Sequence, residues 1–449
     1  MYSIVFLSYF YIISFGQNSP SAKELLKDLG CATCHNGIPV ESDIVEIAPD
    51  LTQSGIRYHP EYIFNYLLYP IKIRQNIGLA RMPNFYLSQR EALALTLYSL
   101  ELIPENIERP DFPFSKSYEK IKASFPEVDA QIGEKIFYAL NCVACHKQSS
   151  VVLWEKKMGP DLSFEGARIK RDWLISYVQQ PESIRPFGFY AGSGSRMPNF
   201  LLIDSEVDTL TAYLLRRKEK FSSDSLLFEP KELSAFSKAK ALKLLKEKLS
   251  CLGCHQLGGE GGRIGPDLSS LSSRLQDEYS YRIIKDPKSL IPEAVMPRIE
   301  TTAGTLDSVV NYLIKQDLLR NESSYLSLVD NHPYFHQGLE KSESLYMKFC
   351  VACHGLNGQG DGYNAKFLPV APTKHADAAY MSTRPDDTLF DGIFAGGYIL
   401  NKSHLMPPWG FVLEYDDIRL LVSYIRKLCQ CVSPEWSRDD LQKFRNQSD

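Results

Sequence analysis

Apolar residues recur along this 449-residue chain with a helical period, most clearly near its C-terminus. There Ile418, Leu421, Val422, Ile425 and Leu428 follow one another at spacings of three or four residues. That spacing places them on one face of an amphipathic helix. The alternation of strands and helices that would predict a parallel sheet is not visible, and the chain is therefore expected to be all-α.

The same order of elements is predicted four times. Each unit opens with a short helix, continues through a turn and a middle helix that ends near a proline, and closes with an amphipathic helix carrying a tyrosine. The opening helices are expected at 23–29, 133–140, 239–249 and 339–348, the clearest middle helix at 171–180, and the closing tyrosines are Tyr98, Tyr213, Tyr312 and Tyr424. These tyrosines are expected to pack between the terminal helices of each unit.

The sequence therefore divides into four tandem helical domains. Their expected bounds are 17–104, 126–220, 236–320 and 336–432, with a polar tail at 433–449. The linkers expected between them, at 105–113, 217–230 and 321–333, are short and contain proline, so neighbouring domains should be held close together.

Each unit contains one Cys-x-x-Cys-His motif, and each motif is followed 45 to 56 residues later by a Met-Pro pair. The motif spacings of 111, 109 and 99 residues indicate an internal repeat. The cysteines are Cys31, Cys34, Cys142, Cys145, Cys251, Cys254, Cys350 and Cys353; the histidines are His35, His146, His255 and His354; the methionines are Met82, Met197, Met296 and Met406.

Cys-x-x-Cys-His is the attachment signature of c-type haem. Two thiols bind the haem vinyl groups, and the histidine is delivered to one face of the iron. A methionine on the other face gives His/Met ligation, which raises the reduction potential. Covalent haem, and hence bound iron, is therefore predicted four times.

Other uses of these cysteines fit less well. A structural zinc site takes four Cys or His ligands, and each motif offers three. A thioredoxin-like thiol pair needs a βαβ context. Disulfides would not explain the Met-Pro pairs. The remaining cysteines, Cys429 and Cys431, could form a disulfide, pair with a partner or stay reduced.

A few other side chains bear on ligation. His404 lies two residues before Met406 and would give bis-His ligation if it replaced the methionine, although the Met-Pro-Pro-Trp-Gly context favours Met406. The other histidines, His59, His332, His336 and His375, are expected at the surface or in loops.

The ends and the charge of the chain suggest where it works. Residues 4–15 carry no charge and precede a small-x-small site, so residues 1–16 are predicted to be a signal peptide and the protein to be periplasmic or otherwise exported. A buried N-terminal helix or an uncleaved anchor is the alternative, and no later run is apolar enough to cross a membrane. The net charge of −4 argues against nucleic acid as a partner.

Each repeat resembles a class I c-type cytochrome domain. The resemblance implies a helical domain around one covalent haem, with thioether bonds at the eight motif cysteines. It implies the motif histidines as proximal ligands and Met82, Met197, Met296 and Met406 as distal ligands. It also implies that a proline carbonyl holds each proximal histidine, which Pro49, Pro160 and Pro266 match; in repeat four, Pro369 or Pro372 could substitute.

Six-coordinate His/Met haem leaves no open position for a substrate, so outer-sphere electron transfer is the expected chemistry and no catalytic residue is predicted. The chain is thus expected to be an exported tetrahaem electron carrier between respiratory or dehydrogenase partners, such as a dehydrogenase, an oxidase or a small electron carrier. The alternatives are a cytochrome subunit docked in a dehydrogenase or reductase complex, and a peroxidase-type enzyme with one labile methionine, for which Met296 is the least secure ligand.

Overall fold

The computed structural model describes residues 20–38, 48–71, 73, 81–108, 115–146, 159–187, 196–218, 228–316, 318, 324–330 and 339–438. Helices make up most of the regular structure in this part of the chain, which agrees with the predicted all-α class. Two short strands, β1 (Gln256–Leu257) and β2 (Glu260–Gly261), pair antiparallel, with Gln256 opposite Gly261. The predicted signal peptide and most of the polar tail lie outside the described residues.

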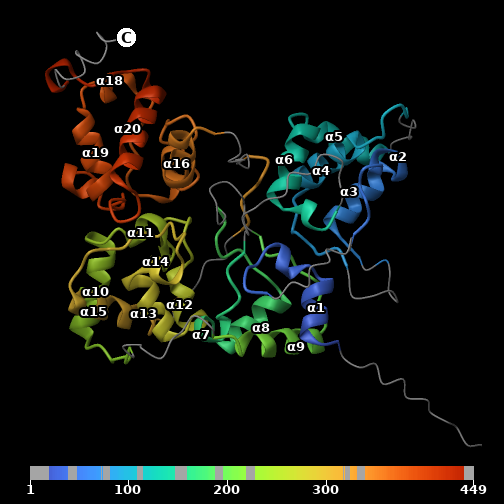
Figure 1. Cartoon of the computed structure of the whole chain (residues 1–449), viewed down its shortest axis with the longest axis horizontal. Coiled ribbons are helices and arrows are strands. Elements are labelled where there is room, and N and C mark those ends of the chain that lie inside the picture. Colours follow the sequence, from blue (N-terminus) through green and yellow to red (C-terminus); the bar gives the residue numbers. More distant parts are fainter. Residues whose placement is uncertain are drawn as a thin grey trace, which may run out of the picture.

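The helices gather into four units, which we call A to D (Figure 1). Unit A contains α1 (Ala22–Asp28), α7 (Glu165–Arg168), α8 (Arg171–Gln179) and α9 (Asp204–Leu215). Unit B contains α2 (Ser54–Arg57), α3 (Pro60–Leu68), α4 (Gln89–Glu101), α5 (Lys116–Ser124) and α6 (Ala130–Ala139). Unit C contains α10 (Ala235–Glu247), α11 (Cys251–Cys254), α12 (Leu271–Arg274), α13 (Asp277–Lys285), α14 (Pro287–Leu290) and α15 (Ala303–Leu313). Unit D contains α16 (Lys341–Phe349), α17 (Val351–His354), α18 (Ala378–Met381), α19 (Asp386–Ala395) and α20 (Tyr415–Cys429).

The opening and closing helices agree with the periodicity to within a few residues. Each closing helix, α4, α9, α15 or α20, carries its predicted tyrosine, and three of the four tyrosines are buried. In unit D, Tyr424 on α20 packs against Tyr346 on α16, with ring centroids 5.0 Å apart. The interpretation of these tyrosines as packing residues between terminal helices is confirmed there.

Repeats one and two exchange their first halves. The opening helix α1 of repeat one packs against α9, the closing helix of repeat two, and α6 of repeat two packs against α4 of repeat one. Figure 1 shows α1 beside α8 and α9, and α6 beside α4. Units A and B are therefore each built from segments of both expected domains, 17–104 and 126–220. Units C and D each come from one continuous stretch of sequence.

The exchanged helices are closely packed. At Gly133 on α6, a Cβ atom would lie 1.9 Å from the carbonyl oxygen of Ala94 on α4, so only glycine allows the two helices to approach this closely. The rings of Tyr98 and Phe137 meet nearby, with centroids 5.4 Å apart. Ile136 and Leu93 are fully buried, and burial of each such side chain contributes about 1.5–3 kcal/mol.

The two chains of the exchange cross at a symmetric backbone bridge. The amide of Asn84 donates to the carbonyl of Asn199 at 2.7 Å, and the amide of Asn199 donates to the carbonyl of Asn84 at 2.8 Å. Two residues beyond each asparagine, Tyr86 and Leu201 adopt a left-handed conformation, both with φ of 53°. The asparagine side chains accept hydrogen bonds from the amides of these two residues, at 2.8 and 2.7 Å, and thereby hold both turns.

The linker between repeats three and four returns to unit B. Its described residues, 324–330, form what we call the strap. The Leu328 amide donates to Glu91 Oε1 at 2.9 Å, and the Tyr325 ring stacks on Tyr86 with centroids 5.4 Å apart. Leu328 is fully buried in the core of unit B. The strap thus packs the linker between repeats three and four against unit B. The proline content of this linker predicted only that neighbouring domains would be held close together.

Candidate haem sites

Each Cys-x-x-Cys-His motif forms a tight helical turn after its opening helix. In all four, the histidine amide donates to the carbonyl of the first cysteine, at 2.9 to 3.0 Å. Residues three and four positions apart lie on one face of such a turn. The spacing therefore directs both thiols and the imidazole to the same side, as covalent attachment beside an iron ligand requires.

All four motif histidines are held by the same kind of hydrogen bond. Nδ1 donates to a backbone carbonyl at 2.9 Å for His35, 2.9 Å for His146, 2.7 Å for His255 and 2.9 Å for His354. With the proton on Nδ1, the lone pair is on Nε2, which is the form of imidazole that binds a metal. Bonds of this kind fix the ring orientation and increase the basicity of the ligand.

The carbonyl partners correct one expectation. Pro266 holds His255, as predicted, but Pro160 of repeat two holds His35, and Pro49 of repeat one holds His146. The exchange of halves is the reason, because each opening helix lies in the unit that contains the other repeat's proline turn. In unit D the partner is neither Pro369 nor Pro372 but the carbonyl of Thr373.

Two of these imidazoles pack closely against the backbone of a glycine. A Cβ on Gly159 would lie 2.4 Å from the ring of His35, and one on Gly265 would lie 2.5 Å from the ring of His255. The Gly-Pro pairs in repeats two and three therefore let the ring pack directly on the backbone while the next residue accepts its hydrogen bond. The imidazole is thus supported on one side by the backbone at Gly159 or Gly265.

Burial disfavours the ionised form of several motif cysteines. Burial raises the pKa of Cys31, Cys142 and Cys350 to about 12 and that of Cys251 to about 11. Reactive and metal-binding cysteines have a lowered pKa. Among the described residues, no three or more His, Cys, Asp or Glu side chains are arranged to hold a metal ion. Seven of the eight motif cysteines are half-buried and Cys350 is buried, and thiol pairs in this setting fit covalent attachment of haem c.

Burial also lowers the pKa of three proximal histidines, His146, His255 and His354. The hydrogen bond to the backbone carbonyl opposes this shift but is the smaller effect in each case. The neutral ring, with its lone pair available, is therefore favoured at these sites. This is the protonation state that iron ligation needs.

The four predicted methionines are half-buried and lie in loops before the closing helices. Met406 packs in the core of unit D, in the same cluster as Trp409. The residues before Met82 and Met197 are anchored across the exchange. Arg81 pairs with Glu206 on α9 at 2.7 Å, and Arg196 pairs with Glu91 on α4 at 2.5 Å. The Met82 loop thus reaches unit A, which holds His35, and the Met197 loop reaches unit B, which holds His146.

Glu91 is the most heavily bonded of these charged residues. Its side chain is 1% exposed and that of Arg196 is 2% exposed. Besides Arg196, Glu91 accepts hydrogen bonds from the amide and hydroxyl of Ser88, at 2.8 and 2.9 Å, and from the strap amide of Leu328. Sequence inspection finds the shared Arg-Met-Pro-Asn-Phe at 81–85 and 196–200, but it does not reveal this role for the arginines.

The attachment motifs meet in two pairs. The side-chain Nδ2 of Asn141, directly before Cys142, donates to Cys34 Sγ at 3.7 Å, which joins the motifs of repeats one and two. Fully buried Asn364 donates from Nδ2 to the Gly253 carbonyl at 2.8 Å and to Cys353 Sγ at 3.3 Å, which joins those of repeats three and four.

Two other histidines differ in their surroundings. His404 donates from Nε2 to the carbonyl of Lys246 on α10 at 3.0 Å, so its ring is directed to the surface of unit C. His375, expected in a loop or at the surface, is instead buried and stacks on the ring of His354, with centroids 4.0 Å apart. Its Nδ1 is hydrogen-bonded to the hydroxyl of Tyr346 at 3.0 Å. A histidine two residues after the Thr373 carbonyl could not be recognised as part of the site from spacing alone.

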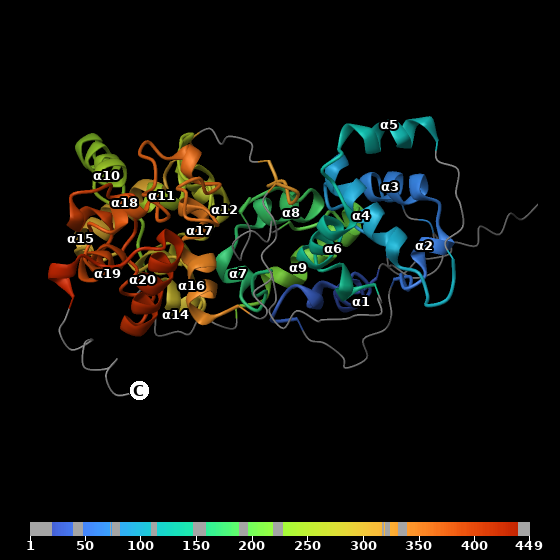
Figure 2. The same cartoon turned by 90° about the horizontal axis from the view of Figure 1, so that it is seen from above.

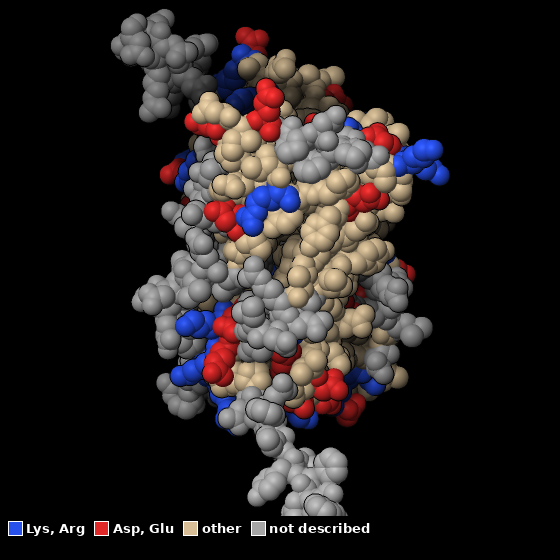
Figure 3. Space-filling view, turned by 90° about the vertical axis from the view of Figure 1, so that its right-hand side faces the viewer, with Lys and Arg blue, Asp and Glu red and all other residues tan. Residues whose placement is uncertain are grey.

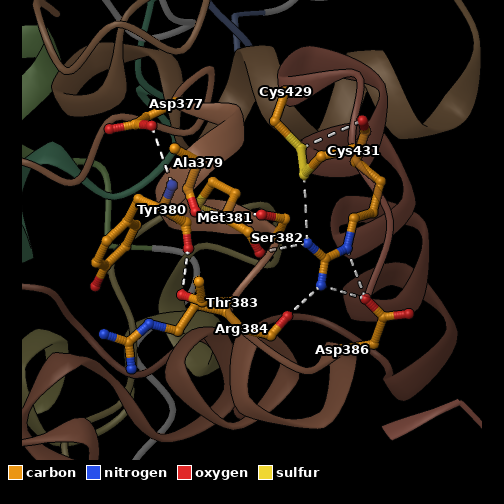
Figure 4. The surroundings of a disulfide bond; sticks show 11 residues. Asp377, Ala379, Tyr380, Met381, Ser382, Thr383, Arg384, Asp386, Cys429 and Cys431 are labelled. Atoms are coloured by element: carbon orange, nitrogen blue, oxygen red, sulfur yellow. Dashed lines mark hydrogen bonds and ion pairs between the residues drawn. A yellow bond between two sulfur atoms is a disulfide. The ribbon is translucent and has the colours of Figure 1, made fainter. Parts of the chain in front are cut away.

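The remaining cysteines, Cys429 and Cys431, form a disulfide at the end of α20. Figure 4 shows it beside the loop between α18 and α19, which contains Arg384 and is flanked by Met381 and Asp386. Arg426 binds that loop through the carbonyl of Met381 at 2.7 Å and the carboxylate of Asp386 at 2.8 Å. The sequence left this pairing open.

Comparison with known proteins identifies cytochrome c domains in two stretches. Residues 130–218 match the family described as "Cytochrome c", and residues 337–425 match "Cytochrome C oxidase, cbb3-type, subunit III". Over 208 residues the chain is 24% identical to the "Cbb3-type cytochrome c oxidase subunit CcoP" of Azospirillum brasilense, an alignment that covers 44% of this chain and 64% of that relative. The chain thus spans less than two thirds of that relative's length.

One solved structure is also similar over a limited range. A chain of the Kuenenia stuttgartiensis reducing HAO-like protein complex Kustc0457/Kustc0458 matches 45% of this chain and 99% of its own length, at 18% identity and a TM-score of 0.17. That likeness is too slight to bear on the function. Among the helices that the structure describes, none has the length and apolar content to cross a membrane.

Proposed function

Because this chain is a multihaem c-type cytochrome, we propose that it carries four haems c and passes electrons between redox proteins outside the cytoplasm. The observation that carries the count of four is the repeated geometry of the motif histidines. All four have Nδ1 bonded to a backbone carbonyl at 2.7 to 2.9 Å. The two repeats outside the matched stretches have the same arrangement as the two inside them.

The chain's own residues divide the work at each site. The two cysteines of each motif would hold the haem, and its iron would be bound by the motif histidine through Nε2 and by Met82, Met197, Met296 or Met406. When bound, haem supplies a one-electron iron couple, and His/Met ligation favours its ferrous form. The protein contributes burial and orientation, and with both axial positions filled it leaves none for a substrate.

Redox proteins are the partners that fit this design. The chain carries a small net negative charge, and on the face in Figure 3 acidic and basic side chains are interspersed. Such a surface suits docking by local complementarity, and charge at the rim of such a contact sets mainly the rate of association. Export, for which the uncharged stretch at 4–15 is the basis, would place these partners in the periplasm.

A second candidate is a fixed subunit of a respiratory complex. The match of residues 337–425 to a cbb3-type oxidase subunit favours it, because that stretch covers unit D except for the last residues of α20. In that case the catalytic partner performs the chemistry and this chain delivers electrons to it. Co-purification of a catalytic subunit from native membranes would distinguish this candidate from a free carrier.

The function is tested by spectroelectrochemical titration of the holoprotein, with haem counted per chain and carbon monoxide added to the reduced form. We expect four haems that do not bind carbon monoxide. Met406→Ala should open one site to carbon monoxide, whereas the matched control His404→Ala should not. Fewer than four haems, or carbon monoxide binding by the unaltered protein, would contradict the proposal and favour the peroxidase-type alternative.

A further inference from the structure

Because repeats one and two exchange halves, the motif that lies next to units C and D cannot be read from the order of the repeats in the sequence. His35 lies in unit A, where Pro160 holds its imidazole, and His146 lies in unit B, where Pro49 holds it. The contact between Asn141 and Cys34 joins these two motifs directly.

Unit A, and not unit B, forms the backbone junction with unit C. Ile169 and Leu275 form an antiparallel bridge. The Lys170 amide donates to the Arg274 carbonyl and the Gln276 amide donates to the Arg168 carbonyl, both at 2.9 Å. The bridge lies nine residues beyond Pro160 and nine beyond Pro266, the prolines that hold His35 and His255. The segments that orient these two histidines are thus joined to each other.

A shared core supports the same junction. Leu25 of α1 and Leu29, which caps that helix before the Cys31 motif, belong to one buried cluster with Leu245 of α10 and Leu252 of the Cys251 motif. The Cys142 motif instead packs in a separate cluster with α4 and the strap. In Figure 1, unit A lies beside unit C, and unit B lies above unit A. In Figure 2, α7 and α8 of unit A lie between α12 of unit C and α3 of unit B.

The junction between units C and D completes the series. Asn364 bonds the backbone of the Cys251 motif and the sulfur of Cys353 with one amide group. Gly253 lies against the loop before Met406, where an added Cβ would lie 2.0 Å from the carbonyl oxygen of Leu405. The motifs of units C and D are therefore in direct contact.

From these three junctions we propose that the haem sites lie in the spatial order His146, His35, His255, His354, which differs from their order in the sequence. This order deepens the proposed function, on which its meaning rests. Repeat two, not repeat one, supplies one end of the series, and repeat four supplies the other. External one-electron donors and acceptors would then meet the chain at units B and D, while the sites of units A and C relay electrons inside it.

The order is tested by magnetic coupling between selected pairs of oxidised haems, which depends on distance and not on turnover. One variant keeps the attachment cysteines of His35 and His255 by replacing Cys142, Cys145, Cys350 and Cys353 with alanine. Its matched variant keeps those of His146 and His255 by replacing Cys31, Cys34, Cys350 and Cys353. We expect resolved dipolar coupling by electron paramagnetic resonance in the first and its loss in the second. Equal coupling, or stronger coupling in the second, would overturn the order.

A second pair of variants keeps all four haems in case removal of two prevents folding. Met82→His with Met296→His, and Met197→His with Met296→His, each create two bis-His sites of lowered potential. At a potential where the His/Met sites are reduced and diamagnetic, only the two altered sites contribute a signal. We expect coupling in the first variant and its loss in the second; the reverse result, or no difference, would overturn the order. A haem count below four in the unaltered protein would instead contradict the proposed function, so the two failures are distinguishable.

Discussion

Units A and B and units C and D bring their attachment motifs together in the same way, but only units A and B exchange halves. Three features at the crossing are present in repeats one and two alone. An arginine precedes the methionine, an asparagine follows the proline, and a glutamate lies in the first turn of the closing helix, as in Arg196, Asn199 and Glu206. At the arginine position, repeat three has Val295 and repeat four has Leu405. The comparison indicates that the exchange is specified at this crossing and not by the motifs themselves.

The difference has a consequence for cooperativity. In units C and D, the helices of each unit come from one stretch of chain, so the loss of structure within either unit can follow the sequence. In units A and B, each core needs a segment from both repeats, so neither repeat can lose its structure alone. Cooperative opening units often coincide with contiguous packing units, and here those units are discontinuous in sequence.

The largest expected effect comes from removing an attachment motif, because the loss of hydrogen-exchange protection should cross between repeats in units A and B but not in units C and D. Cys31→Ala with Cys34→Ala should lose one haem and deprive α8 and α9, which belong to repeat two, of protection from hydrogen exchange. The reason is that α1 and the His35 site form the core of unit A together with those helices. The matched variant Cys251→Ala with Cys254→Ala should affect α10 to α15 of its own repeat. Loss of protection in α2 to α4 with α8 and α9 unaffected would contradict the exchange.

Breaking the buried Arg196–Glu91 ion pair at the crossing should have the next largest effect, on the free energy of unfolding. Arg196→Ala leaves the carboxylate of Glu91 buried with its partner removed, and such a change costs about 3–5 kcal/mol in the free energy of unfolding. Asp416→Ala is the control, because the Arg419–Asp416 pair is exposed on α20 and such pairs contribute about 0–1 kcal/mol. Denaturant unfolding followed by circular dichroism measures both. A similar loss in the free energy of unfolding for the two variants would mean that Arg196 does not determine the crossing.

Much of each unit could be predicted from the sequence because its determinants are local. The period of apolar residues gives the opening and closing helices, and the motif spacing gives the turn that directs Cys142, Cys145 and His146 to one side. The resemblance to cytochrome domains implied the carbonyl bond of His255, and this bond is also local, because Pro266 follows His255 by only 11 residues. These features depend on short-range geometry that the order of residues determines.

The exchange could not be predicted because it leaves all local patterns unchanged. The helix α6 buries the same face whether it packs on α4 or α9, so periodicity cannot distinguish the two arrangements. Equivalent residues in the two repeats, such as Pro49 and Pro160, supply the same carbonyl in either case. The available signal was the shared Arg-Met-Pro-Asn-Phe together with a glutamate ten residues after each arginine, Glu91 or Glu206. Which arginine pairs with which glutamate is a long-range choice.

The asparagines that join the paired motifs should differ in how much they stabilise the protein. Asn364→Ala removes buried bonds to Gly253, Cys353 and the Arg263 amide, which lies 2.7 Å from Asn364 Oδ1. Leaving buried groups without partners costs about 1–3 kcal/mol. Asn141→Gly, which keeps the left-handed backbone but removes the long contact to Cys34 Sγ, should cost less. Thermal unfolding of the holoproteins would measure both, and a larger loss for Asn141→Gly would reverse this ranking.

The smallest effect concerns the two left-handed residues at the crossing itself. Leu201 is 42% exposed with φ of 53°, so Leu201→Gly should remove a conformational penalty of about 1–2 kcal/mol. The greater freedom of glycine in the unfolded chain offsets about 0.5–1 kcal/mol of that gain, which leaves a stabilisation of up to about 1 kcal/mol. Tyr86→Gly relieves the same backbone angle but loses the stack on Tyr325 of the strap, and it should therefore destabilise the protein. Chemical denaturation measures the free energy of unfolding of the two variants. An equal gain in stability for both would mean that the Tyr86–Tyr325 stack contributes little to holding the halves of the chain together.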